Sequence, residues 1–475
     1  MRKLSLGNMF RIRRNLICLL VLVILCPYTQ LVHSTDLLDI YQQALENDPI
    51  FKKAYSTYKA NSEAVPQAFA TLLPQLNLNG TLARTLINVN GLGDSIQSTY
   101  YNQTWQVSAS QAIFNWQAWS QVSQSKASVK AAQATFNDAA QDLILRSSQA
   151  YFTVLFAQDT LSFAEAKKRA NKRQLEQARQ RFLVGLDPIT SVYEAKAGYD
   201  QSVAQVIAAN NDVINQKENL RKLTNHVYET LAPLRNSQIP LIQPEPNNIN
   251  TWIDLGLKQN FKLFAARYNL DSARNNIKTQ ASSNWPVIAI QGTSVGTNNS
   301  VDTNSYFVPQ RQIVSNVALA MTFPIYQGGL TASKTRQAKY NFQSASESLE
   351  MVYRDVEVNS RIAFNTIIDG ISKVKADRQT IISQRNSLES TEAQFEVGTR
   401  TMVDVVNAQR RLFEAQTQLA QDQYNLIHAL LNLKYLAGTL NVQDLEEINT
   451  WLQTMRINQF PPARPNSAKP NHKRL

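Results

Sequence analysis

Cysteine and histidine are scarce in this chain of 475 residues. The two cysteines, Cys18 and Cys26, both lie near the N-terminus, so the rest of the chain has neither disulfides nor thiolate ligands. The four histidines show no metal-binding spacing, and neither a nucleophile elbow nor a phosphate-binding glycine loop occurs. We therefore expect no enzymatic activity, no cofactor and no metal site.

Long apolar runs are also absent beyond residue 34, where no run reaches the roughly 18 residues of a transmembrane helix. Residues 1–34 combine basic residues, a short apolar stretch at Leu16–Leu25 and a small residue, Ser34, before the expected cleavage site. This order is typical of a secretory signal peptide, with an uncleaved anchor as the alternative. The bulky Leu25 argues against lipidation of Cys26.

The net charge of +12 falls to +7 when the five basic residues of segment 1–34 are removed. Much of the remaining positive charge lies in a Pro/Asn/Lys-rich tail, 451–475, which lacks the apolar content to fold. A basic tail can bind nucleic acid or anionic lipid. For an exported chain we expect no nucleic-acid partner.

The sequence repeats itself after 212 to 213 residues. Phe182–Asp200 is answered by Phe395–Phe413, and Pro74–Gly80 is answered by Pro286–Gly292. A period this long excludes a short solenoid and indicates two copies of one unit. The predicted organisation has five parts, namely a signal peptide 1–34, a first repeat 35–235, a Pro-rich linker 236–251, a second repeat 252–450 and the tail 451–475.

Each copy is predicted to begin with one helical stretch, about 37–72 and 252–283, followed by a β-hairpin at 75–115 and 287–326. Apolar and polar residues alternate along these hairpins, as in strands with one apolar and one polar face. Aromatic residues gather near the strand ends, as at membrane interfaces. We expect strands of a membrane β-barrel, and the alternative is a soluble hairpin packed on a core.

A long helical hairpin follows in each copy, at 117–224 and 330–437. Its first helix carries a seven-residue repeat, which predicts coiled-coil packing. The seam positions of the second copy are Ala338, Phe342, Ala345, Leu349, Val352 and Val356, and those of the first are Ser125, Val129, Ala132, Phe136, Ala139 and Leu143. A helix of about 65 residues spans roughly 100 Å. A structural coiled-coil adhesin of the outer membrane, without transport, is the alternative to a channel.

Two hairpins supply four strands, which cannot close a membrane barrel. Open sheet edges do not occur in lipid, so the chain must associate with copies of itself. A dimer would give 8 strands and a trimer 12. Small and polar residues at inward helix positions favour a water-filled space over a leucine core.

Two segments resemble the TolC family of outer-membrane efflux and secretion channels: FPIYQGG, Phe323–Gly329, and the stretch Gly398–Leu445. The resemblance covers about residues 36–450. It implies a mainly α-helical homotrimer in the outer membrane of a Gram-negative bacterium, with a 12-stranded barrel continued by a periplasmic coiled-coil tunnel. It also implies outer-membrane lipid as surroundings, and as partners a periplasmic adaptor and an inner-membrane transporter of RND, ABC or MFS type.

The resemblance further assigns roles at the two Val-Gly turns. The pore constriction would comprise Asp404 and Asn407, where the family often has two aspartates. Three Asp404 side chains around a narrow axis would repel one another, which would raise their pKa values, and the negative ring would attract cations. The alternative is that Asp404 is simply an acid favoured by the dipole at a helix N-terminus. The predicted gate latch comprises Arg400, Phe395, Ser191 and Asp187, in which Ser191 and Phe395 replace the family's aspartate and tyrosine. The predicted adaptor contacts are Val184, Gly185, Leu186, Val397, Gly398 and Thr399.

Overall fold

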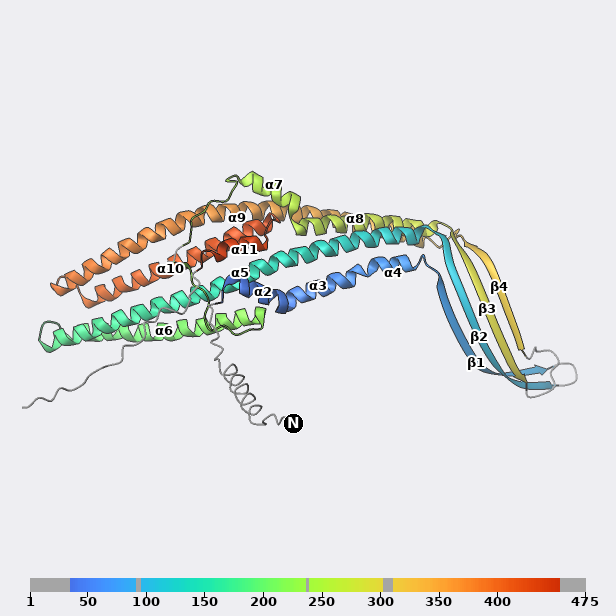
Figure 1. Ribbon diagram of the computed structural model, residues 1–475, viewed down its shortest axis with the longest axis horizontal. Coiled ribbons are helices and arrows are strands. Elements are labelled where there is room, and N and C mark those ends of the chain that lie inside the picture. The colour runs from blue at the N-terminus through green and yellow to red at the C-terminus, as the bar shows by residue number, and fades with distance from the viewer. Residues whose placement is uncertain (1–34, 91–94, 236–238, 302–310, 453–475) are drawn as a thin grey trace, which may run out of the picture.

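A computed structural model describes residues 35–90, 95–235, 239–301 and 311–452. The predicted signal peptide 1–34, nearly all of the predicted tail 451–475 and part of the predicted linker 236–251 lie outside the described residues. Among the described residues, no helix combines the length and apolar content needed to cross a membrane. The chain forms an elongated helical body, with four strands at one end and two helical turns at the other (Figure 1).

The elements of the first repeat are, in chain order, α2 (Leu37–Asn47), α3 (Pro49–Ser62), α4 (Ala64–Ala70), β1 (Gln75–Asn90), β2 (Ser95–Asn115), α5 (Trp116–Leu183) and α6 (Ile189–Thr224). Those of the second are α7 (Ile249–Gln259), α8 (Phe261–Ala281), the short 3-10 helix η2 (Ser282–Asn284), β3 (Val287–Val301), β4 (Arg311–Thr322), α9 (Leu330–Glu396), α10 (Met402–Leu436) and α11 (Val442–Asn449). At 68 and 67 residues, α5 and α9 are each about 100 Å long.

The helical stretch predicted before each hairpin is not a single helix. The first breaks at Asp48, whose carboxylate accepts a hydrogen bond from the N–H of Phe51 at 3.0 Å while Pro49 begins α3. The second breaks at Asn260, whose side chain caps α8 through the N–H of Leu263 at 3.1 Å. These capping side chains start a new helix and end the previous one. The two breaks lie 212 residues apart, at the same place in each repeat.

The two largest apolar cores hold the helical body together. The larger one lies in the middle of the body and joins α5, α9 and α10 to α2, α7 and α11, with fully buried Tyr151, Ile367 and Ile427 at its centre. The smaller one lies near the turns and takes side chains from α5, α6, α9 and α10, including Phe395, Met402 and Val405. The four long helices therefore pack as one unit at the turn end.

The four strands form one antiparallel sheet in the order β1-β2-β3-β4. Apolar side chains line one face and remain largely exposed, with Leu76 and Leu78 each 73% and Val317 81% accessible. Within this face, Trp105 of β2 covers its register partner Gly296 of β3, where a Cβ atom would come within 2.2 Å of the indole. The sheet thus presents an apolar surface that no other described part of the chain covers.

A β-bulge between Ala112 and Phe114 shifts the pairing of β2 with β3. Beyond the bulge Phe114 pairs with Ile288, a residue of the apolar face. The bulge therefore turns Phe114 onto that face, where it lies with Trp116 near Trp285 at ring-centroid distances of 6.4 and 6.3 Å. This aromatic cluster marks the helix-proximal border of the apolar surface, as aromatic residues do at membrane interfaces.

Gly438 follows the C-terminal end of α10, and its substitution tests how this helix end packs against the chain around Gln259. Its φ of 72° is left-handed, and a Cβ there would lie 2.3 Å from the carbonyl oxygen of Gln259. We predict that Gly438→Ala lowers the apparent unfolding temperature much more than Gly185→Ala. Gly185 shares the left-handed conformation but has open space around it, so its substitution costs only the backbone strain of about 1–2 kcal/mol. Thermal unfolding followed by circular dichroism checks this, and equal losses would contradict it.

Candidate functional site at the helical turns and the apolar sheet

The α5–α6 and α9–α10 turns share one backbone geometry. In the first, the N–H groups of Gly185 and Leu186 donate to carbonyls of the preceding helical turn at 3.0 and 2.8 Å. In the second, Gly398 and Thr399 make the equivalent bonds at 3.0 and 2.9 Å. Both glycines are left-handed, at φ 76° and 82°, as this Schellman-type helix end requires. The local sequence Val-Gly therefore gives both helical turns the same backbone conformation.

Apolar side chains project into solvent at both turns. Val184, Leu186 and Val397, all predicted adaptor contacts, are 69%, 66% and 75% exposed. Leu183 beside them is 74% exposed. Apolar groups gathered at the end of an otherwise polar helical body form a surface suited to contact with another protein.

Arg181 joins the two turns. Its guanidinium donates to both carboxylate oxygens of Asp187, at 2.9 and 3.3 Å, and this bidentate pair spans the α5–α6 turn. The same guanidinium lies 5.1 Å from the ring centre of Phe395 and donates to the carbonyl of Glu396 at 3.5 Å, both in α9. Asp187 was predicted as a latch residue, but Arg181 was not. One side chain therefore ties the first helical hairpin to the second.

The other predicted latch residues are not all brought together. Phe395 is buried against Met402 and Val405 in the smaller core, and Ser191 is buried at the start of α6. Arg400 instead stays on its own turn. It donates to Gln394 at 3.1 Å and lies 3.8 Å from Asp404. Within one chain, Arg181 makes the contact between hairpins and Arg400 does not.

Asp404 and Asn407 lie in the first two turns of α10, and both are half-buried. Asp404 forms a capping box with Thr401. Its carboxylate accepts from the Thr401 N–H at 3.0 Å and from the Thr401 hydroxyl at 2.9 Å. These bonds favour the charged form and lower the pKa of Asp404. A single chain thus gives Asp404 the helix-capping role, and the predicted rise of its pKa concerns only a ring of several chains.

A buried polar seam runs along α5 above the turn. Lys167, Asn171 and Gln174, spaced like one stripe of a coiled coil, are 5%, 1% and 8% exposed. The Lys167 ammonium donates to Gln205 of α6 at 2.9 Å and lies 5.0 Å from the ring centre of Phe413 in α10. Burial lowers the pKa of Lys167. Polar layers weaken a helix interface relative to apolar ones, so this part of the bundle is less tightly fixed than its ends.

Acidic side chains are also buried or paired further along the body. The hydroxyl of Tyr424 donates to Asp159 at 2.7 Å, and burial raises the pKa of Asp159. Asp377 of α9 faces Asp422 of α10. Burial and then the adjacent Asp422 carboxyl raise the pKa of Asp377, while Lys373 opposes the rise. These groups resist ionisation in their present packing, so they couple the helical body to pH.

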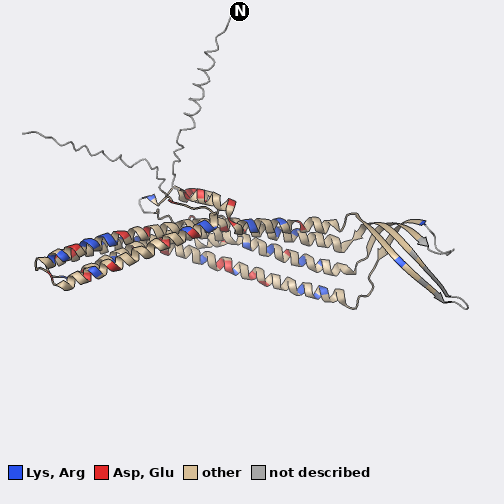
Figure 2. Ribbon diagram, turned by 90° about the horizontal axis from the view of Figure 1, so that it is seen from below, with Lys and Arg blue, Asp and Glu red and all other residues tan. Residues whose placement is uncertain are grey.

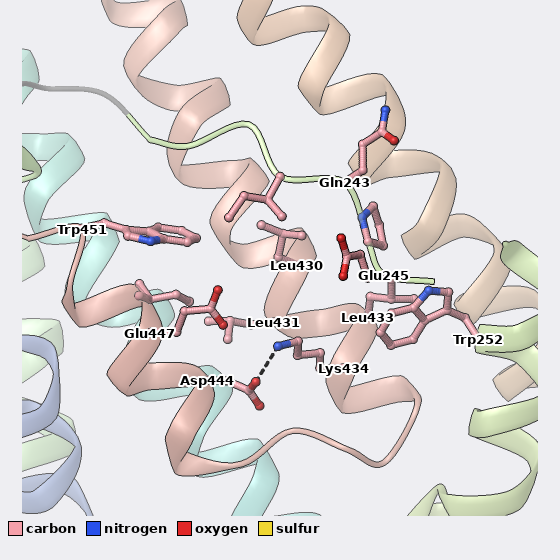
Figure 3. A pocket seen from close by; sticks show the side chains of 13 residues that line it. Gln243, Glu245, Trp252, Leu430, Leu431, Leu433, Lys434, Asp444, Glu447 and Trp451 are labelled. Carbon is pink, nitrogen blue, oxygen red and sulfur yellow. Dashed lines mark hydrogen bonds and ion pairs between the residues drawn. The ribbon is translucent and has the colours of Figure 1, made fainter. Parts of the chain in front are cut away.

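A pocket of about 260 Å³ lies in the middle of the body, where the linker between the repeats passes α10 and α11. Figure 3 shows Trp252 and Trp451 at opposite sides of it, with Lys434 pointing to Asp444. The ion pair between Lys434 and Asp444 measures 2.5 Å and joins α10 to α11. With its walls largely apolar and Lys434 paired to Asp444, the pocket serves chiefly as the seam that fixes the linker.

The outer membrane efflux protein family model matches residues 40–226 and 252–439. These two matched segments correspond to the two copies read from the sequence. The chain belongs to the outer membrane efflux protein family. The predicted family resemblance is therefore confirmed.

Several relatives are similar in sequence to this chain over about nine-tenths of its length. Outer membrane protein TolC is 34% identical in Escherichia coli, covering 92% of this chain and 89% of the relative. In Vibrio cholerae it is 36% identical, covering 93% and 100%. The proteases secretion protein PrtF of Dickeya chrysanthemi is 26% identical, covering 89% and 92%.

A solved structure shares the fold. That of CusC superposes with a TM-score of 0.73 at 16% identity, covering 85% of this chain and 92% of the other. Together with the relatives, this confirms the predicted function and location. The chain is an outer-membrane duct of the efflux and type I secretion class, with its helical body extending into the periplasm.

The Asp377–Asp422 pair predicts a pH dependence. An acid with a raised pKa contributes stability that is present below its unfolded pKa and lost as the pH rises through the folded pKa. We therefore predict that Asp377→Asn raises the unfolding temperature at pH 7, by only about 1–2 °C because Asp377 is partly buried and solvent screens its charge. The gain should vanish below about pH 4.

The matched control is Asp355→Asn, an exposed aspartate on the same helix. Melting curves of both variants between pH 4 and pH 8 check the prediction. A gain that does not depend on pH, or one that the control shares, would show that the carboxyl pair is not its source.

Proposed function

We propose that three copies of the chain form a 12-stranded barrel continued by a helical tunnel. The observation that carries this proposal is the open sheet. Within the described strands, β1 and β4 have no pairing partner on their outer sides, and the apolar face is bare. In lipid the backbone groups of both edges require partners, which β4 of one subunit and β1 of the next supply.

The choice of three copies over two follows from the bore. An eight-stranded barrel has an interior filled by its own side chains, whereas wider barrels leave an aqueous channel. A duct therefore needs the 12 strands of a trimer. The polar face of the sheet, with Asn79, Gln106 and Thr293 at alternate positions, faces the water of this bore.

The two repeats, 35–235 and 252–450, supply equivalent parts to this assembly. Their helix breaks recur after 212 residues and their Val-Gly turns after 213, which supports a pseudo-sixfold tunnel of two hairpins per subunit. We further propose that the turns form the periplasmic mouth, with Asp404 and Asn407 at its constriction. The exposed tips Val184–Leu186 and Val397–Thr399 then dock a periplasmic adaptor, which links the duct to an inner-membrane transporter of RND, ABC or MFS type.

Loss of the protein tests this function directly. We predict that a deletion strain becomes hypersensitive to detergents and dyes, and that the purified protein conducts ions in planar bilayers. A coiled-coil adhesin without a bore predicts neither effect. Normal resistance together with the absence of conductance would contradict the duct.

Arg181 should hold the closed mouth more strongly than Arg400. Arg181 contacts α9 as well as Asp187, while Arg400 contacts only its own turn. Loss of a charge-assisted pair of about 1–2 kcal/mol shifts the closed-to-open ratio roughly five- to thirtyfold. We predict that Arg181→Ala raises channel conductance or open time clearly above wild type in single-channel recordings.

Arg400→Ala serves as the matched control and should change the recordings little, because among the described residues Arg400 contacts Gln394 and Asp404 of its own hairpin and no latch partner of the other. A larger jump for Arg400→Ala than for Arg181→Ala would contradict this assignment.

A further inference from the structure

Charged residues are rare in the sheet. Within the described strands, 75–90, 95–115, 287–301 and 311–322, the charged residues are Arg84 and Arg311. In Figure 2 the strand region is tan apart from isolated blue positions, whereas the helices carry both red and blue. Two cations without an acidic counterpart in these strands are unexpected next to a membrane and call for a partner.

Both arginines lie on the apolar face. Arg84 lies two residues from both Leu82 and Leu86 along β1 and therefore shares their face, on which they are 73% and 53% exposed. Arg311 shares the parity of Ile313, which is 65% exposed. Because side chains of a strand point alternately to the two faces, both guanidinium groups belong to the side that faces lipid.

Their heights above the helical body are similar. Arg84 lies nine residues beyond the helix-proximal start of β1, and Arg311 lies eleven residues before the helix-proximal end of β4. At about 3.3 Å per residue and a tilt of about 40°, both stand roughly 23–28 Å above the strand bases. The apolar band of a barrel is about 25 Å tall, so both arginines lie at its outer border.

Polar neighbours surround them at this border. Gln103, Asn298 and Arg311 lie in one row across three strands, and the amide of Asn298 donates to Gln103 at 3.4 Å. The Arg84 guanidinium lies 5.9 Å from the ring centre of its register partner Tyr101. Near its outer end, the leucine and valine surface is therefore interrupted by a band of hydrogen-bond donors, and Leu86 lies two residues further out on the same face.

We propose that this band binds the phosphate groups of an anionic lipid in the outer leaflet. Guanidinium groups pair with phosphate through two parallel hydrogen bonds, and such pairing removes the cost of leaving a cation at the lipid border. The proposal rests on the trimer proposed above. There β4 of one subunit adjoins β1 of the next, which brings Arg311 and Arg84 to each of the three junctions.

Native mass spectrometry of the detergent-purified protein tests the proposal, because one spectrum reports both subunit number and bound lipid. The probes are bisphosphorylated lipid A and zwitterionic phosphatidylcholine. We expect lipid A to remain bound to the wild type and phosphatidylcholine to dissociate. The double variant Arg84→Gln/Arg311→Gln should bind lipid A about tenfold more weakly, because each bidentate pair lost costs at least a factor of several.

Arg354→Gln provides the control, since it removes the same charge from an exposed site on α9 outside the sheet. Equal retention of lipid A by the double variant and the control would overturn the proposal, as would equal retention of both lipids by the wild type. A wild type that is not trimeric would instead overturn the proposed assembly. Lipid retention by the separate subunits, compared in the same way, would still decide the role of the two arginines.

Discussion

The hydrogen-bonding demand of the backbone in lipid governs this molecule. Each strand edge carries N–H and C=O groups that water satisfies in solution and nothing satisfies in hydrocarbon. The sheet of this chain is bare on one face and open at β1 and β4. A protein of the outer membrane cannot leave these groups unpaired, and this is why we propose that identical subunits pair their sheet edges. In this proposal, the width of the bore depends on how many strands the subunits contribute together.

The helical body is long, and the contacts that hold its middle differ from those near the turns. Its middle is fixed by the large apolar core and by ion pairs such as Lys434–Asp444. Toward the turns, a polar stretch with Lys167, Asn171 and Gln174 precedes the smaller apolar core, and Arg181 adds a contact between the two hairpins at the tip. Polar contacts of this kind have alternative partners at similar energy, whereas an apolar core does not. The arrangement places the adjustable part of the body at the end opposite to the membrane.

The sequence predicts much of this because its signals are periodic and local. Alternation at Leu76, Leu78 and Leu82 identifies a strand and its apolar face without any tertiary information. The Val-Gly turns are equally local, since glycine is the residue most favoured at a left-handed helix end. The break at Asp48 was missed although an N-cap followed by proline is a helix start signal. The break at Asn260 lacks the proline and is hidden by continuous helix-forming residues.

Contacts between segments distant in sequence could not be predicted. Arg181 meets Phe395 only because two hairpins pack side by side, and the cover of Gly296 by Trp105 depends on the register of β2 with β3. Likewise, the capping box of Asp404 competes with its predicted pore role, and only the backbone geometry shows that the first is satisfied within one chain. Periodicity gives the elements, whereas the packing decides which polar side chains become partners.

Cysteine cross-linking between subunits tests the central claim most directly, because the chain beyond residue 26 contains no cysteine that would interfere. A small panel of pairs, with one cysteine on the outer edge of β1 and one on the outer edge of β4, is oxidised in outer membranes and separated by mass. The account predicts a ladder that ends at a closed covalent trimer. A ladder that ends at a dimer, or that stays at the monomer for every pair, would contradict it.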